Sequence, residues 1–126
     1  MKVINVNLKE NSYEILIKQD LIKEVVSKIR AIYEGKKLAV ITDENVHSIY
    51  GMELKKTLSL GGFEPSFIVL EPGEKSKSLD TLNYIYSKLV EFNITRTDMI
   101  VAFGGGVVGD VTGFAASTYL RGIPYI

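Results

Sequence analysis

The segment that decides the fold is MIVAFGGGVVGDVTGFAASTYLRG, residues 99–122. It opens with five apolar residues in a row, Met99–Phe103, and such unalternated runs are typical of strands buried on both faces of a parallel sheet. Glycines follow this run and permit a tight turn. A helical pattern then covers about Val107–Leu120. The segment therefore predicts a strand, a turn and a helix in immediate succession.

The glycines of this turn also indicate a ligand. Gly104, Gly106 and Gly109 match G-x-G-x-x-G, in which glycine lets a diphosphate approach the backbone N–H groups. The N-terminus of the following helix adds partial positive charge and free N–H donors. We interpret the loop as a phosphate-binding site; the alternative is a tight strand–helix turn with close helix packing. No Lys-Ser or Lys-Thr pair closes the loop, so it is not a P-loop.

Two similar apolar runs lie upstream, Leu38–Ile41 and Phe67–Leu70, and helical patterns follow them at about Met52–Leu60 and Ser78–Phe92. This alternation predicts an α/β domain, with a mostly parallel sheet and helices on both faces. Right-handed crossovers place every strand-to-helix loop at one edge of that sheet, which is where ligands bind in such folds.

The N-terminal residues follow a different pattern. Residues 3–18 alternate apolar and polar side chains around a polar turn, which predicts a β-hairpin. We expect Asp20 to cap an amphipathic helix over residues 22–33, and Gly35 to end it. At the other terminus, residues 122–126 begin a further strand, so we expect the domain to be truncated there. The open sheet edge predicts self-association, as does a helix face rich in small residues.

Composition narrows the function classes. The 15 basic and 15 acidic residues of the 126-residue chain cancel, which fits one globular domain without a basic surface for nucleic acid. Cysteine is absent and His47 is the only histidine, so we expect no disulfide, no thiol catalysis and no metal site. No apolar run approaches the roughly 18 residues of a membrane helix, and the N-terminus lacks a secretory signal. The sequence thus predicts a soluble cytoplasmic domain.

Charged residues follow the two upstream strands. The carboxylate of Asp43 could accept hydrogen bonds from ribose hydroxyls. The alternative is that Asp43 is the N-cap of the next helix. It precedes the glycines by 61 residues, whereas the dinucleotide fingerprint has its carboxylate about 20 residues after them. Lys75 and Lys77 lie near a predicted helix N-terminus, where cations are unfavourable. An anionic ligand would relieve that repulsion; the alternative is a solvated loop.

Three features of the last helix have two interpretations each. Asp110 is expected in the first turn, where it compensates the dipole or accepts hydrogen bonds from ribose or substrate hydroxyls. Gly109, Gly113 and Ala116 share a face that a neighbouring strand or helix, or a nucleotide, approaches closely. Arg121 is expected to close the helix, where a cation suits the dipole, or to bind phosphate or carboxylate.

Three segments resemble the N-terminal domain of the 3-dehydroquinate synthase family: TDENV (42–46), EPGEKSKS (71–78) and FGGGVVGDVTGFAASTYLRGIPYI (103–126). The last segment is long and specific, and the resemblance spans essentially the whole chain. Glycerol-dehydrogenase and iron-dependent alcohol-dehydrogenase types share a similar glycine loop but lack the ASTYLRGIPYI continuation. The resemblance implies a Rossmann-like NAD-binding α/β domain over residues 1–126, preceded by a hairpin and without the C-terminal helical domain of the family.

The resemblance also implies a cofactor site. The pyrophosphate of NAD would lie on the glycine loop, the adenosine ribose at Asp43 and the nicotinamide ribose near Asp110. Glu74 and Lys77 would contact the nucleotide, and Arg121 would bind the substrate phosphate. The implied cofactor residues are Asp43, Glu74, Lys77, Gly104, Gly105, Gly106, Val107, Val108, Gly109 and Asp110.

The implied activity is that of a homodimeric lyase of the shikimate pathway. It would convert 3-deoxy-D-arabino-heptulosonate 7-phosphate, a phosphorylated sugar acid, to 3-dehydroquinate and phosphate with NAD and a divalent metal, zinc or cobalt. The metal ligands of the family lie beyond residue 126, so we expect the 126-residue chain to be inactive alone. The alternatives are a non-catalytic nucleotide-binding or dimerisation module and the NAD domain of a glycerol-dehydrogenase-like enzyme.

Overall fold

The computed structural model describes all residues, Met1–Ile126. Its centre is a parallel sheet of β3 (Lys37–Asp43), β4 (Glu64–Leu70) and β5 (Met99–Phe103) in the order β4-β3-β5. The three unalternated apolar runs form these strands, and β3 at the centre is buried almost throughout. The predicted parallel α/β sheet is therefore confirmed.

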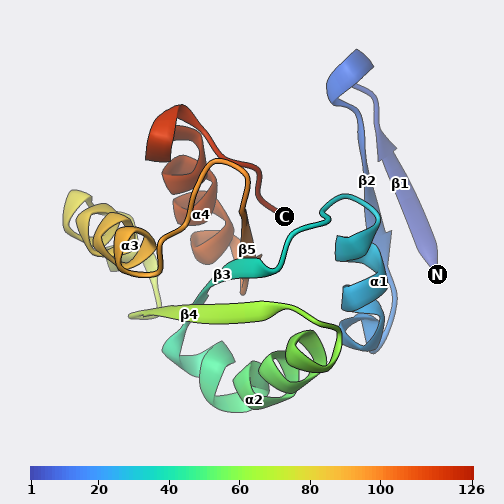
Figure 1. Cartoon of the computed structure of the whole chain (residues 1–126), viewed down its shortest axis with the longest axis horizontal. Coiled ribbons are helices and arrows are strands. Elements are labelled where there is room, and N and C mark those ends of the chain that lie inside the picture. Colours follow the sequence, from blue (N-terminus) through green and yellow to red (C-terminus); the bar gives the residue numbers. More distant parts are fainter.

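Four helices cover the two faces of the sheet (Figure 1). The helices α1 (Val25–Arg30) and α2 (Glu44–Leu60) lie on one face, and α3 (Leu79–Glu91) and α4 (Gly106–Thr118) on the other. Side chains of β3 alternate between the two cores, because successive residues of a strand point to opposite faces. Leu38 and Val40 join the core under α1 and α2, and Ala39 and Ile41 join the core under α3 and α4.

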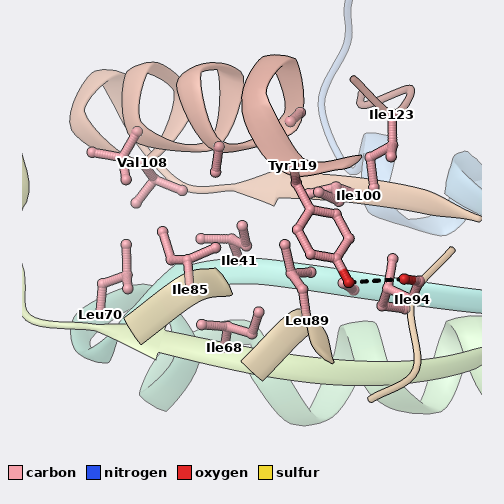
Figure 2. Close-up of a cluster of buried hydrophobic side chains, with 14 residues drawn as sticks. Ile41, Ile68, Leu70, Ile85, Leu89, Ile94, Ile100, Val108, Tyr119 and Ile123 are labelled. Atoms are coloured by element: carbon pink, nitrogen blue, oxygen red, sulfur yellow. Dashed lines mark hydrogen bonds between the residues drawn. The ribbon is translucent and has the colours of Figure 1, made fainter. Parts of the chain in front are cut away.

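The larger core lies between the sheet and helices α3 and α4 (Figure 2). Ile85 and Leu89 of α3 pack on Ile68 of β4, and none of the three is exposed. Tyr119 closes this core: its hydroxyl donates a 2.9 Å hydrogen bond to the Ile94 carbonyl oxygen. Burial and the nearby Asp98 carboxylate raise the pKa of this phenol, which keeps the hydroxyl protonated as a donor.

Residues 124–126 extend the sheet beyond β5. The Ile100 N–H donates to the Pro124 carbonyl at 3.1 Å, and the Ile126 N–H donates to the Ile100 carbonyl at 3.0 Å. The bridge between Ile100 and Tyr125 is parallel. The prediction that this terminus begins a further strand is confirmed.

The N-terminal hairpin consists of β1 (Lys2–Val6) and β2 (Tyr13–Ile17), which pair antiparallel as a sheet of their own. The predicted hairpin is thus confirmed. Ser12 organises the connection, since its hydroxyl accepts a 2.8 Å hydrogen bond from the Leu8 N–H and donates to the Lys9 carbonyl. Within the connection Lys9 has a left-handed φ of 57°.

The predicted helix over residues 22–33 is wrong in its bounds and in both caps. Asp20 has a left-handed φ of 55° and makes no capping hydrogen bond; a short 3-10 turn then precedes the six-residue α1. The helix α1 ends well before Gly35, and local hydrogen bonds hold the turn that follows it. Tyr33 turns back so that its hydroxyl donates to the Lys37 carbonyl at 2.8 Å, and the Arg30 guanidinium donates to the Gly35 carbonyl.

Other boundaries differ less. The helix α2 begins at Glu44 rather than at Met52, and α4 ends at Thr118 rather than near Leu120. The bounds of α3 match the prediction to within one residue at each end. None of the helices combines the length and the apolar composition needed to cross a membrane.

Candidate functional site

The three parallel strands end side by side at one edge of the sheet. The register pairs Asp43 at the end of β3 with Leu70 at the end of β4, and Thr42 with Phe103 at the end of β5. The three loops that the sequence singles out therefore meet at this edge, as predicted. Each loop leads into a helix, so helix N-termini also gather here.

Side-chain oxygens cap two of these helices. An oxygen of Asp43 accepts a 2.8 Å hydrogen bond from the Val46 N–H at the start of α2. The Ser78 hydroxyl accepts a 3.2 Å hydrogen bond from the Thr81 N–H at the start of α3. The capping interpretation of Asp43 is thus confirmed, and only one of its two carboxylate oxygens is used in this way.

The glycine loop has no such cap. Gly105 occupies the N-cap position of α4, which begins at Gly106, and no side chain accepts a hydrogen bond from the N–H groups of the first turn. The helix end therefore presents unpaired N–H donors together with the positive end of its dipole. Of the helices α2, α3 and α4, which all begin at this edge, only α4 has no side chain that accepts hydrogen bonds from its first N–H groups.

The glycines of the loop differ in what surrounds them. A Cβ at Gly104 would lie 2.8 Å from a methyl group of Val108, so packing within the loop requires glycine there. A Cβ at Gly105, Gly106 or Gly109 would meet no atom within 4 Å. The tight-turn interpretation explains Gly104 alone, whereas open space beside the other three glycines is what an approaching ligand needs.

Lys77 connects the loop after β4 to α4. Its ammonium lies 2.9 Å from an oxygen of Asp110 and 3.4 Å from an oxygen of Glu74. Hydrogen bonds to Asp110 and then to Glu74 raise the pKa of Lys77. Lys75 pairs with Glu71 at 3.1 Å. The repulsion expected between these lysines and the helix N-terminus is thus relieved by carboxylates of the chain.

The position of Asp110 corrects one prediction. Because α4 begins at Gly106, Asp110 is its fifth residue and not part of the first turn, which contains no acidic side chain. Dipole compensation is therefore the wrong interpretation. The carboxylate lies beside Lys77 at the carboxyl edge of the sheet. Its side chain is 68% exposed, so it remains accessible to a ligand.

Two clefts flank the paired charges. One, of about 370 Å³, lies between the starts of α3 and α4 and has an apolar floor that includes Leu82, Val111 and Phe114. Lys77 and Asp110 stand at its rim. The other, of about 300 Å³, lies between the end of β4 and α3 and is more polar, with Glu71 and Asp80 in its lining. Both clefts open at the carboxyl edge of the sheet.

The small-residue face of α4 packs within the chain. A Cβ at Gly113 would lie 2.9 Å from the Tyr125 hydroxyl oxygen, and the Ala116 carbonyl accepts a 2.8 Å hydrogen bond from the Ile123 N–H. Ala116 is completely buried. The segment after α4 therefore covers this face, as one of the two interpretations expected. The other interpretation, a nucleotide against Gly113 and Ala116, is wrong. The same cover removes this helix face as a surface for self-association.

Arg121 does not close α4. The helix ends at Thr118, and Leu120, Arg121 and Gly122 then have positive φ angles of 49°, 65° and 111°. Left-handed backbone is uncommon for side-chain-bearing residues, so this turn separates Arg121 from the helix dipole. The side chain is exposed.

His47 packs rather than converging with other ligands. Its ring lies 5.4 Å from the Phe67 ring, and it covers Gly51, where a Cβ would come within 2.7 Å of the imidazole. This supports the structural interpretation of His47. No group of three or more histidine, cysteine, aspartate or glutamate side chains is arranged to hold a metal ion.

Sequence reasoning missed two features of the edge. The ring of Tyr50, on α2, makes an edge-to-face contact with Phe103 directly before the glycine loop, 6.5 Å between centroids. Ser76 is buried and its hydroxyl donates to the Glu71 carbonyl, which fixes the loop after β4. Tyr50 lies outside the segments quoted above, and Ser76 lies within EPGEKSKS (71–78) but was given no role there. Both contacts depend on how the chain folds.

Sequence comparison shows which known proteins the chain resembles. Residues 67–126 match the sequence model described as 3-dehydroquinate synthase N-terminal. The whole chain is 50% identical to the 3-dehydroquinate synthase of Clostridium botulinum and 51% identical to that of Clostridium kluyveri. The chain is therefore similar to the N-terminal part of 3-dehydroquinate synthases. It spans 36% and 35% of the length of these two relatives, about a third.

Solved structures of two other synthases share the fold. ValA, the 2-epi-5-epi-valiolone synthase of Streptomyces hygroscopicus solved with NAD+ and Zn2+ bound, superposes with a TM-score of 0.79 at 29% identity. It covers 95% of this chain, which corresponds to 33% of ValA. A 2-deoxy-scyllo-inosose synthase superposes with a TM-score of 0.84 over 98% of the chain and 35% of its own, at 22% identity, and so shares the fold.

Proposed function

We propose that this chain is the NAD-binding part of a 3-dehydroquinate synthase. The single observation that carries the proposal is the glycine loop, where an uncapped helix N-terminus meets open space beside Gly105, Gly106 and Gly109. A pyrophosphate accepts hydrogen bonds from such N–H groups and is attracted by the helix dipole. The NAD+ in the structure of ValA, whose fold matches 95% of this chain, supports the same choice of ligand.

The neighbouring residues fit the two ends of a dinucleotide. The carboxylate oxygen of Asp43 that does not cap α2 is available to the hydroxyls of the adenosine ribose. Lys77 forms ion pairs with Glu74 and Asp110, which supports a shared role for the three residues beside the glycine loop. Glu74 and Lys77 would contact the nucleotide, and Asp110 would lie near the nicotinamide ribose. We propose these roles for Asp43, Glu74, Lys77 and Asp110, with residues Gly104–Gly109 holding the pyrophosphate.

The charge at the edge distinguishes between nucleotides. Its carboxylates outnumber its ammonium groups, with Asp43, Glu44, Glu71, Glu74 and Asp110 against Lys75 and Lys77. Such a surface repels an additional phosphate on the adenosine ribose. We therefore propose NAD and not its 2′-phosphorylated form as the ligand.

The chemistry of the complete enzyme needs groups that this chain does not provide. NAD, when bound, supplies a hydride acceptor for a substrate hydroxyl. The residues of this chain do not fit a divalent metal, since no cluster of ligands is present. We propose that the metal ligands lie in the remaining sequence of a full-length synthase, and that the exposed Arg121 binds the substrate phosphate, its guanidinium pairing with two oxygens.

A complementation assay tests the proposal. The 126-residue chain should release no phosphate from the sugar-acid substrate with NAD and zinc. Release should begin when a polypeptide carrying the remaining two-thirds of a relative is added, and Gly106→Val should abolish it. Phosphate release by the 126-residue chain alone, or undiminished release with Gly106→Val, would contradict the proposed division of roles.

A further inference from the structure

Ser76 differs from its neighbours in the loop between β4 and α3. Residues 71–78 form this loop, and Ser76 is its only buried residue, with a relative exposure of 3%. A buried hydroxyl costs free energy unless it is hydrogen-bonded. Three polar residues of the chain are buried, and only Ser76 forms a side-chain hydrogen bond, whereas the hydroxyls of Thr42 and Thr112 have no partner. The bonded serine therefore has a defined place in a loop of charged residues.

The hydroxyl of Ser76 closes this loop. It donates to the carbonyl oxygen of Glu71, the first residue after the paired strand β4. Between these two residues Gly73 turns the chain with a positive φ of 100°, and its carbonyl accepts a 3.1 Å hydrogen bond from the Ser76 N–H. Two hydrogen bonds from one residue thus hold residues 71–76 as a closed loop. Lys77 is the first residue after it.

Lys77 extends from the closed loop to α4. The 3-10 turn Glu74–Ser76 lies against α4. The Lys77 ammonium pairs at 2.9 Å with Asp110 of α4 and at 3.4 Å with Glu74 of the turn. A lysine side chain is flexible, so the position of its backbone limits where the ammonium can lie. Ser76 fixes the backbone directly before Lys77, and its hydroxyl therefore acts on these ion pairs.

We propose that Ser76 is a positioning residue that holds the Lys77 ammonium between Glu74 and Asp110. Because Lys77 is expected to contact NAD, the importance of Ser76 for the cofactor rests on the function proposed above. Ser76 itself need not touch the nucleotide, since its hydroxyl donates to a carbonyl of its own loop. A serine with a purely structural role would change the melting temperature of the chain and not the ionisation of Lys77.

Titration of the lysine side chains by NMR tests the position of Lys77 in the 126-residue chain without any nucleotide. Hydrogen bonds to Asp110 and Glu74 raise the pKa of Lys77. In Ser76→Ala, which loses the hydroxyl, this pKa should fall toward its ordinary value. Ser76→Cys, whose thiol is a weaker donor, should give a smaller fall. An unchanged pKa of Lys77 in both variants would overturn the proposal.

Ser78→Ala is the matched control on the same loop. The Ser78 hydroxyl caps α3 on the other side of Lys77, so its loss should lower the melting temperature. The pKa of Lys77 should nevertheless stay raised. An equal fall of this pKa in Ser78→Ala and Ser76→Ala would overturn the proposal, because any loosening of the loop would then suffice.

Calorimetric titration with NAD tests the consequence for the cofactor in a polypeptide completed to the length of the relatives. Ser76→Ala should weaken NAD binding by about fivefold, and in a Lys77→Met background it should cause no further loss. Additive losses would overturn the proposal, since Ser76 would then act by a route other than Lys77. Unchanged NAD affinity in Lys77→Met would overturn the proposed contact of Lys77 with NAD and the role of Ser76 with it. A loss with Lys77→Met but none with Ser76→Ala would overturn the role of Ser76 alone.

Discussion

Lys77 determines the charge balance of the candidate site at the scale of single residues. Its one ammonium pairs with two carboxylates, Asp110 and Glu74, that come from different elements. Without it, an anionic nucleotide would approach an edge that carries only one other ammonium, that of Lys75. We therefore propose that Lys77 contributes to nucleotide affinity through its charge. Its contribution to the stability of the fold is small, because exposed ion pairs stabilise proteins little.

Lys77→Met should weaken NAD binding by about tenfold in a polypeptide completed to the length of the relatives, as expected for the loss of one charged contact. Lys77→Arg should retain most of the affinity. Calorimetric titration at low and high salt measures this, and the melting temperature should stay nearly constant. Lys75→Met is the matched control, because Lys75 forms its ion pair with Glu71 on the same loop. An equal loss of affinity in both variants would show that Lys77 has no special position.

Two buried hydroxyls have no hydrogen-bond partner, those of Thr42 and Thr112, and both residues are completely buried. An unsatisfied buried hydroxyl costs free energy that an isosteric methyl group does not. Thr112→Val should therefore raise the free energy of unfolding by about 1 kcal/mol, measured by urea denaturation. Thr57→Val, at a half-exposed position on α2, should give no such gain. A loss of stability at Thr112 would indicate that its hydroxyl has a partner after all.

At the scale of elements, the contrast between three helix starts defines the site. The helices α2 and α3 begin at the same edge as α4, but Asp43 and Ser78 satisfy their N-terminal donors. The helix α4 begins with glycines that leave its donors free. The loop before α4 therefore differs from the other two in the property that anion binding requires.

Gly106→Val should abolish detectable NAD binding in the completed polypeptide, because its side chain would occupy the space that a pyrophosphate must enter. The fold should survive, since a Cβ there meets no atom of the chain. Isothermal titration calorimetry and thermal melting together measure the two effects. Ser117→Val places the same side chain near the exposed C-terminal end of α4 and should leave NAD affinity intact. Unchanged affinity with Gly106→Val would remove the loop from the cofactor site.

Most of the parallel sheet could be predicted from the sequence, because β3, β4 and β5 lie between two helix layers and read as continuous apolar runs. The start of α2 was predicted too late, although Val46, Ile49 and Tyr50 stand at helical spacing. The cap at Asp43 was a second signal for this start. The early end of α1 was hidden, because the hydrogen bonds that hold the turn after it, among them that of Tyr33, leave no pattern in the sequence. The ion pair of Lys77 with Asp110 joins residues that only the folded sheet brings together.

Those contacts of Tyr33 make stability depend on alkaline pH. Burial, and secondarily the Asp98 carboxylate, raise the pKa of Tyr33 to about 12, above its value of 10.0 in the absence of these effects. The folded state thus holds this proton more tightly than the unfolded state, so its contribution is complete below pH 10 and is lost between pH 10 and about 12. The loss is at most about 2.7 kcal/mol. Urea denaturation should show a shallower decline over this range for Tyr33→Phe; identical slopes would contradict this.

At the scale of the whole molecule, the candidate site lies at the carboxyl edge of the parallel sheet, and the N-terminal hairpin lies away from it. The chain spans about a third of the length of its relatives. We propose that it provides one wall of a cofactor cleft. The glycine loop, the paired charges around Lys77 and the two clefts all lie at the carboxyl edge of the sheet. The N-terminal hairpin lies at the opposite end.

The most direct test of the central claim is a titration of the 15N-labelled 126-residue chain with NAD, followed by the amide resonances. Binding to one wall of the cleft is expected to be weak, so the titration extends to about 10 mM NAD. The account predicts shifts confined to the amides of residues 104–110, with smaller shifts at residues 43–46 and 74–77, and none in the hairpin. Shifts that avoid the glycine loop, or equal shifts across the molecule, would contradict it.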